Sequence, residues 1–291
     1  MHKLYGYPKL MKAGIGNMLV PWAKCFIWCK DNNIPMIDPF WSKLRVGPYL
    51  RGERDKRNYQ KLFVSNGICG LRRLYLLLTA KKQRAQTFAL QSPQAHDAIV
   101  VFEDMSNFDI LIDRHQEIKL ALQSITKAEY LPSKASRPFI GIHVRQGDYL
   151  KFADMDSAPW LSRLPLEWYT AALCEIRKML GFELEAVVFS DGADSELSSL
   201  ITLPNVSRSP HSEAITDIFA LSGAAIIIGS CSSFSMWGAY LAQTLTVWYK
   251  GRCPGKVLCD HDLEAEWLEG DQFPTGFAAR LAELQLTHKA G

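Results

Sequence analysis

The stretch RPFIGIHVRQGDY, residues 137–149, determines how the rest of the chain is interpreted. Within it, Phe139–Val144 is an almost unbroken apolar run, interrupted only by a glycine and a histidine. Such a run is typical of a parallel strand that is covered on both faces. The turn after it carries Arg145, Gly147 and Asp148. The stretch therefore predicts a buried parallel strand that ends in a polar turn.

Arg145 stands where the predicted strand ends. Open α/β sheets bind their ligands outside the carboxyl ends of the strands. An arginine is always charged and carries five N–H donors in a planar fork, which suits a phosphate or a carboxylate. His143 lies two residues earlier and therefore on the same face of the strand. The alternative from these residues alone is an edge strand with a solvated arginine and an ordinary turn at residues 146–148.

The composition is that of a folded protein. The 291 residues suffice for two domains of ordinary size or for one large α/β domain. Apolar residues make up 48% and charged residues 22%, which argues against a disordered chain. The longest candidate for a membrane span, residues 214–228, is interrupted by polar side chains. The N-terminus lacks the apolar segment of a signal peptide, so we expect a cytoplasmic protein.

The seven cysteines are scattered through the chain. Cys25 and Cys29 are four residues apart on an expected helix, without a CxxC pair or a cluster of histidines. This pattern favours reduced, buried thiols and predicts no zinc site.

Positive charge is concentrated in one stretch, although the formal charge of the whole chain is only +3. Between Lys43 and Arg84 there are twelve basic residues and two acidic ones. Within that stretch, Arg72–Lys82 reads RRLYLLLTAKK, the pattern of an interfacial amphipathic helix. The charge fits a solvated face, a contact with an anionic membrane or a nucleic-acid footprint. We favour the first two, because no nucleic-acid-binding motif accompanies the charge.

A glycine-bearing loop, KAGIGN at residues 12–17, precedes an expected helix over Met18–Lys30. Gly14 and Gly16 permit backbone angles, or a close approach, that other residues forbid. A loop that leads into a helix N-terminus directs backbone N–H groups at whatever lies beyond, often an anion. An ordinary turn is the alternative.

The rest of the first half predicts a short strand at residues 36–38, a helix at 68–83, a strand at 98–102 and a helix at 113–127. Leu131–Pro138 has the proline and serine content of a linker. We place the domain boundary there, which gives domains 1–135 and 136–291. Whether the last helix packs back on the N-terminal domain stays open.

Strands and helices alternate at short spacing in the second half, which predicts βαβ units on a parallel sheet and an α/β fold. Besides the central strand, strands are expected at 185–189, 205–206, 225–228 and 245–249, and helices at 165–180, 194–200, 213–222 and 233–243. Polar residues follow three of these strands, namely Arg145, Ser190-Asp191 and Gly229-Ser230. If the three strands are neighbours, these residues meet in one crevice.

The segment IIIGSCSSFSMWGAYL, residues 226–241, has small and hydroxyl side chains between an expected strand and an expected helix. Backbone amides, hydroxyls and the helix dipole at such a place suit a phosphate. The alternative is that Ser232 and Ser233 only cap the helix.

Four short segments, taken in order, resemble one known superfamily. HVRQGDY at 143–149 resembles the HxRRxDY signature of the fucosyltransferase superfamily, and SSFSMWGAYL at 232–241 resembles the NSTFSWWxAxL segment of the α-1,2-fucosyltransferases, glycosyltransferase family 11. FSD at 189–191 is similar to their FSDD segment, and KAGIGN is similar to their N-terminal GxxGNQ loop. The four segments span residues 12–241.

The resemblance implies a GT-B-like α/β architecture, with two Rossmann-like domains facing across a cleft. It implies an inverting transfer of fucose from GDP-fucose to a glycan hydroxyl, through an α-1,2 linkage, without a metal or a cofactor. GDP-fucose would be held mainly by the C-terminal domain, and the N-terminal domain would lie on the acceptor side.

Matched to the family motifs, Arg145 would contact the β-phosphate and stabilise the leaving GDP, and Asn17 would face the reacting sugar. The donor-binding residues implied in the same way are His143, Asp191, Asp217, Ser232, Ser233, Phe234, Gly14 and Gly16. Of these, Asp191 would contact the ribose or the base. Asp217 would read guanine, because a carboxylate accepts hydrogen bonds from both N1–H and the exocyclic amine.

The chain departs from the family pattern at several positions. Gln146 replaces the second arginine, and Gly192 stands where a second aspartate is common. Met18 replaces the usual glutamine, and residues 229–231 replace a stretch that usually contains asparagine. The loss of a positive charge at residue 146 leaves open a second function, a non-catalytic protein that binds a nucleotide sugar or phosphate.

An acceptor hydroxyl needs a base for its proton. Asp38, Glu103, Asp104 and Asp148 are candidate carboxylates, and the sequence does not choose among them. The basic amphipathic stretch suggests an acceptor glycan carried on a membrane lipid, as a hypothesis.

Overall fold

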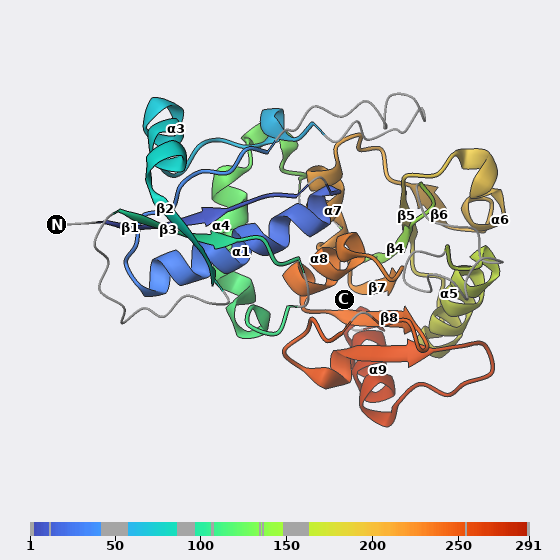
Figure 1. Cartoon of the computed structure of the whole chain (residues 1–291). Coiled ribbons are helices and arrows are strands. Elements are labelled where there is room, and N and C mark those ends of the chain that lie inside the picture. The colour runs from blue at the N-terminus through green and yellow to red at the C-terminus, as the bar shows by residue number, and fades with distance from the viewer. Residues whose placement is uncertain are drawn as a thin grey trace. The chain divides into compact units, whose positions relative to one another are not determined.

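The computed structural model describes residues 3–11, 13–41, 58–85, 97–105, 108–133, 135, 137–147, 163–253 and 255–289 (Figure 1). These residues divide into two compact units, the first ending at Leu131 and the second beginning at Pro132. Each unit has its own parallel sheet.

The first unit is built on a three-stranded parallel sheet in the order β1-β3-β2. Its strands are β1 (Leu4–Pro8), β2 (Lys81–Arg84) and β3 (Ala98–Phe102). The expected strand at residues 36–38 is present only as two isolated bridges, Gly6 to Met36 and Ile37 to Ile68. Strand β3 is buried along its whole length, as its apolar run predicts.

The described α-helices of this unit are α1 (Ile15–Asp31), α3 (Gly70–Thr79) and α4 (His115–Ile125). Helix α1 lies so close to β1 that a Cβ atom on Gly6 would be 2.2 Å from the Sγ atom of Cys29. The glycine is therefore required for this packing, and Cys25 and Cys29 are buried thiols, as expected.

The expected helix at 68–83 is wrong in its second part. Helix α3 ends at Thr79, Ala80 has extended backbone angles, and Lys81 and Lys82 belong to β2. The N–H group of Lys81 donates to the carbonyl of Asp97, which starts the pairing of β2 with β3. Residues 81–84 carry no strand signal of their own, so their structure depends on a distant apolar strand.

The second unit has a six-stranded, fully parallel sheet in the order β6-β5-β4-β7-β8-β9. The strands are β4 (Ile140–Val144), β5 (Ala186–Ser190), β6 (Val206–Arg208), β7 (Ile226–Gly229), β8 (Leu245–Tyr249) and β9 (Glu264–Trp267). All five residues of β4 are buried, and β4 pairs with both β5 and β7. The prediction of a central, doubly covered strand is confirmed.

Helices cover both faces of this sheet (Figure 1). They are α5 (Leu166–Leu180), α6 (Ser198–Ile201), α7 (Ala214–Leu221), α8 (Ser233–Ala242) and α9 (Thr275–Lys289). Ile140, Ile142 and Val144 share one core cluster with residues of α5, α6 and α9. On the other face, α7 packs so closely that a Cβ atom on Gly141 would be 2.6 Å from Leu221.

Strand β9 and the bounds of helix α9 were not predicted. Ala265 and Trp267 of β9 are buried, and β9 pairs with β8. Phe277 and Leu281 place α9 in the core of the second unit, where it contacts α5.

Candidate functional site

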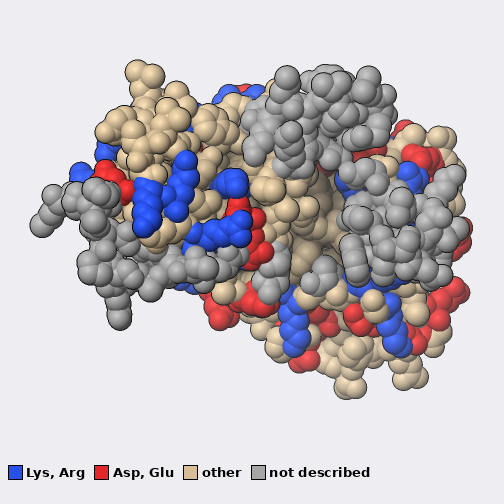
Figure 2. All heavy atoms as spheres, in the orientation of Figure 1, with Lys and Arg blue, Asp and Glu red and all other residues tan. Residues whose placement is uncertain are grey.

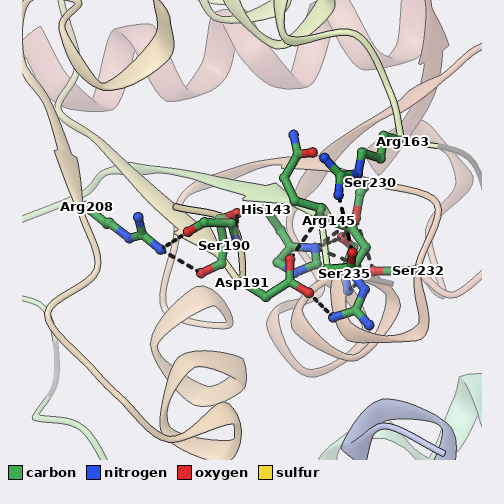
Figure 3. A network of polar contacts seen from close by, with 12 residues as sticks. His143, Arg145, Arg163, Ser190, Asp191, Arg208, Ser230, Ser232 and Ser235 are labelled. Atoms are coloured by element: carbon green, nitrogen blue, oxygen red, sulfur yellow. Dashed lines mark hydrogen bonds and ion pairs between the residues drawn. The ribbon is translucent and has the colours of Figure 1, made fainter. Parts of the chain in front are cut away.

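The candidate site lies at the carboxyl ends of three neighbouring strands of the second unit (Figure 3). Val144 of β4 is in register with Ser190 of β5, and His143 is in register with Gly229 of β7. The polar residues that follow the three strands therefore meet at one edge, as their positions in the sequence predicted.

His143 is the buried centre of this site, with 4% of its surface exposed. Its Nδ1 atom lies 2.8 Å from the Ser230 hydroxyl and 2.7 Å from the Ser235 hydroxyl. Phe234 stacks on the imidazole with ring centroids 4.4 Å apart and planes at 12°. Burial, reinforced by the nearby charge of Arg145, lowers the pKa of His143 to about 3. The ring is therefore neutral at pH 7, and its tautomer decides whether Nδ1 donates to a serine hydroxyl or accepts from one.

The serine loop, residues 229–233, connects β7 to the start of α8. The N–H group of Ser230 donates to the carbonyl of His143 over 3.1 Å, which ties the loop to β4. Ser232 is the N-cap of α8, and its hydroxyl accepts from the N–H group of Ser235 at 3.4 Å. Capping and anion binding are compatible here, because the other N–H groups of a first helical turn have no partner within the helix.

Arg145 and Asp191 form an ion pair at the ends of β4 and β5. The other carboxylate oxygen of Asp191 accepts from the N–H group of Gln146 over 2.8 Å. A Cβ atom on Gly147 would be 2.2 Å from Asp191 Oδ2, so any other residue at 147 would have to displace that carboxylate. Both oxygens of Asp191 thus orient Arg145 and its turn, and the contact of Asp191 with ribose or base stays a prediction.

Two further arginines, which sequence reasoning missed, hold the same turns. Arg208 is the last residue of β6, and it donates to the carbonyls of Ser190, at 3.1 Å, and Gly192, at 2.6 Å (Figure 3). Arg163 donates to the carbonyl of Gly147 at 3.3 Å. A basic residue at the end of the expected strand near 205–206 was the only available signal for Arg208.

Two of the departures from the family pattern, Gln146 and Gly192, are in contact. A Cβ atom on Gly192 would be 2.8 Å from Gln146 Cγ and 3.0 Å from Gln146 Cβ. Gln146 is 5% exposed, so its side chain is packed rather than presented to solvent. The two replacements therefore form one packing unit.

Asp217 lies in the first turn of α7 and accepts from the Ser209 hydroxyl over 2.5 Å. Ser209 directly follows β6, and its N–H group donates to Val188 of β5 over 2.9 Å. Asp217 is thus half-buried at the same edge of the sheet, beside β6, which β5 separates from β4.

Gly14, Gly16 and Asn17 belong to the first unit, and their contact with the donor stays a prediction. Gly14 is the N-cap of α1, and the other two lie in its first turn, so the helix begins earlier than predicted. Among the described residues, a Cβ atom on Gly14 would have no neighbour within 4 Å.

Three of the four candidate carboxylates lie in the described part of the first unit, and each has a protein partner. Asp38 accepts from Ser65, and burial raises the pKa of its carboxyl group. Glu103 pairs with Lys9 at 2.7 Å and Arg84 at 3.0 Å, and Asp104 pairs with Lys24 at 2.7 Å. The two carboxylates that follow β3 are therefore engaged in ion pairs within the protein; Asp148 lies outside the described residues.

Within the described ranges, there is no group of three His, Cys, Asp or Glu side chains that could hold a metal ion. A cavity of about 790 Å³ opens at the amino ends of β4, β5 and β6, beside Arg137 and Glu183. It lies at the opposite end of these strands from His143, so it is separate from the candidate site.

A parallel sheet whose carboxyl edge joins an arginine to a helix N-terminus is typical of α/β proteins that bind phosphate groups. Residues 102–250 match the family model of Glycosyl transferase family 11. This match covers more than half of the chain, and the chain belongs to that family. The predicted family is confirmed.

Solved structures show the same fold. The fucosyltransferase NodZ from Bradyrhizobium is 14% identical with a TM-score of 0.53, over 84% of this chain and 94% of NodZ. NodZ alpha-1,6-fucosyltransferase soaked with GDP-fucose is 14% identical with a TM-score of 0.52, over 88% of this chain and 98% of that one. The predicted GT-B-like α/β class is confirmed. The comparison with curated proteins gave no match.

Proposed function

We propose that this protein transfers fucose from GDP-fucose to a hydroxyl group of a glycan acceptor, with inversion and through an α-1,2 linkage. The observation that carries the proposal is the joined site at β4, β5 and β7, where Arg145 and the start of α8 lie at one sheet edge. NodZ, which has the same fold, was soaked with GDP-fucose in one of its crystal structures, and this supports the choice of donor. Family membership supports the linkage.

In this proposal, the charge that develops on the departing diphosphate is stabilised by Arg145 and by the first turn of α8. Groups that are already oriented before the reaction stabilise such a charge most effectively. Asp191 provides that orientation for Arg145, and His143 provides it for the serine loop. Asp217 would read the guanine base, and Asn17 would face the sugar from the first unit.

We also propose that no metal takes part, because a guanidinium and a helix N-terminus can together take up the diphosphate charge. Transfer should then proceed at an unchanged rate in EDTA. A loss of activity that Mg²⁺ or Mn²⁺ restores would contradict this.

The test of the donor site is thermal stability with GDP, GDP-fucose, UDP and NAD. A ligand at about one hundred times its Kd stabilises by roughly 2.7 kcal/mol, which is a shift of several degrees for a chain of this size. We expect shifts with the guanine nucleotides only, and their loss in Arg145→Ala. Arg280→Ala is the matched control, since Arg280 pairs with Asp260 on the surface of the same unit.

Measurement of turnover distinguishes a transferase from the alternative, a nucleotide-sugar-binding protein without catalysis. The neutral, packed side chain of Gln146 favours that alternative, because it leaves one cation fewer at the site. Release of GDP only in the presence of a galactoside acceptor, with an inverted product by NMR, supports the transferase. Guanine-nucleotide binding without transfer to any acceptor in a glycan panel supports the binding protein.

A further inference from the structure

Helix α3 of the first unit presents an apolar stripe to solvent. Leu71, Leu74, Tyr75 and Leu78 are 85%, 46%, 64% and 84% exposed. Their spacing of three, four and seven residues places them on one face of the helix. A solvated helix face normally carries polar side chains, and exposed apolar patches of this kind mark interaction sites.

The opposite side of α3 is held by the unit itself. Leu76 is buried in a cluster with residues of β1 and β3. Arg73 donates to the carbonyls of Asp38 and Pro39 and lies 3.8 Å from the ring centroid of Phe40. Because Arg73 faces inward, it is not one of the cations at the outer surface. The helix is thus anchored with its apolar stripe outward.

Exposed cations are found on the same helix and on the strand that follows it. Arg72 is exposed on α3, and Lys81 and Lys82 are exposed on β2, which follows the helix after one residue. Figure 2 shows blue side chains directly beside the mostly tan surface at the place of α3 in Figure 1. The sequence contains no acidic residue between Asp55 and Asp97. An anionic surface is therefore the electrostatic complement of this region.

From this we propose that the α3 stripe and the adjacent Lys81 and Lys82 dock the protein on an anionic lipid bilayer. Exposed leucines with a tyrosine and flanking lysines are the composition of an interfacial helix. Protein–protein interfaces are instead depleted in lysine. Helix α3 has ten residues and is about 15 Å long, so it lies on a bilayer rather than crossing it. The other described helices also lack the length and apolar character of a membrane span.

The experiment is co-sedimentation of the full chain with vesicles of phosphatidylcholine alone or mixed with phosphatidylglycerol. We expect binding to the mixed vesicles that weakens with added salt. Leu71→Ser with Leu78→Ser should lower the partition coefficient about tenfold or more. Lys81→Gln with Lys82→Gln should lower it about twenty-fivefold, since each basic residue near an anionic surface contributes about fivefold.

Two controls match these variants. Leu120→Ser changes an exposed leucine on α4, and Lys178→Gln with Lys256→Gln removes two exposed cations from the second unit. Both should bind vesicles within about twofold of the unaltered protein. Equal binding by the α3 and control variants would overturn the proposal, as would no binding to the anionic vesicles.

The oligomeric state of the same samples tests whether the stripe binds a second copy of the chain instead of a bilayer. A dimer that Leu71→Ser with Leu78→Ser converts to a monomer, without vesicle binding, would identify the stripe as an interface between two copies and overturn the proposal. Thermal shifts with GDP are recorded for every variant. Retained shifts together with lost vesicle binding separate this docking surface from the proposed donor site.

Discussion

The two units use the carboxyl ends of their parallel strands in different ways. In the second unit, Asp191 after β5 orients Arg145 and the turn after β4, and His143 of β4 contacts Ser230 after β7. In the first unit, Glu103 after β3 pairs with Lys9 after β1 and with Arg84 of β2, and Asp104 pairs with Lys24. Both sets of contacts join strand ends, but those of the second unit also reach a buried imidazole and the start of a helix, the features on which the proposed donor site rests.

The largest difference is expected between the arginine–carboxylate pairs of the two units. Arg145→Lys keeps the positive charge but loses the planar fork, and should lower kcat/KM for fucose transfer about a hundredfold. Arg114→Lys alters the pair with Asp31, in which the two hydrogen bonds are 2.9 and 2.8 Å long. We expect that variant to transfer within about twofold of the unaltered enzyme. Similar losses in both would remove the distinction between the units.

A second difference should appear in the pH dependence of stability. Unfolded His143 takes up a proton below about pH 6.5. In the folded protein, burial lowers the pKa of His143 to about 3. The unfolded state therefore binds more protons between these values, and stability falls as the pH drops from about 6.5 towards 3.

Urea unfolding between pH 7.5 and 4.5 measures this dependence. His143 should contribute a slope of up to about 1.4 kcal/mol per pH unit, which is lost in His143→Gln. His115→Gln, at the start of α4 in the first unit, should keep the slope of the unaltered protein. Parallel curves for all three proteins would show that His143 does not remain neutral on folding.

Gly147 in HVRQGDY and Gly14 in KAGIGN should differ about tenfold in how strongly their replacement by alanine weakens GDP binding. In Gly147→Ala the new Cβ atom would displace Asp191, which orients Arg145. In Gly14→Ala the new Cβ atom meets none of the described residues within 4 Å. Titration calorimetry should show that Gly147→Ala weakens GDP binding about tenfold. A factor of this size corresponds to the free-energy cost of one overpacked side chain. A larger loss in Gly14→Ala would place a ligand against the start of α1.

The smallest effects are expected from the carboxylates of the first unit. Glu103→Gln and Asp104→Asn each remove a partly exposed ion pair, which contributes up to about 1 kcal/mol to stability. Their kcat should stay within about twofold. A hundredfold or larger loss of kcat in either variant, with GDP affinity retained, would indicate that this carboxylate accepts the acceptor's proton. The first unit would then also contribute to catalysis.

Sequence reasoning succeeded where the signal was local. The apolar runs of β3, β4, β7 and β8 predicted buried strands, and the serine loop predicted the N-terminus of α8. It failed where structure depended on distant partners. Strand β2 consists of KKQR and exists because β3 pairs with it, and β1 contains Gly6 and Pro8, which weaken a strand signal.

The same limit applies to the site. The positions of His143, Arg145 and Ser232 follow from strand ends and a helix cap, which short motifs reveal. The role of Arg208 depends on backbone carbonyls 16 and 18 residues away in the sequence. The pairing of Arg145 with Asp191 joins residues 46 positions apart. The strand ends predicted that Arg145 and Asp191 lie at one edge, but no local pattern predicted that they pair or that Arg208 binds those carbonyls.

The contact between Gln146 and Gly192 also constrains how this chain can change by mutation. An aspartate at residue 192 would need a Cβ atom 2.8 Å from Gln146 Cγ, so it would meet a steric penalty unless residue 146 moved. An arginine at residue 146 would bring a longer, charged side chain into a packed position beside a glycine that offers no carboxylate. Each step towards the family pattern is thus unfavourable alone, and the two positions are expected to change together.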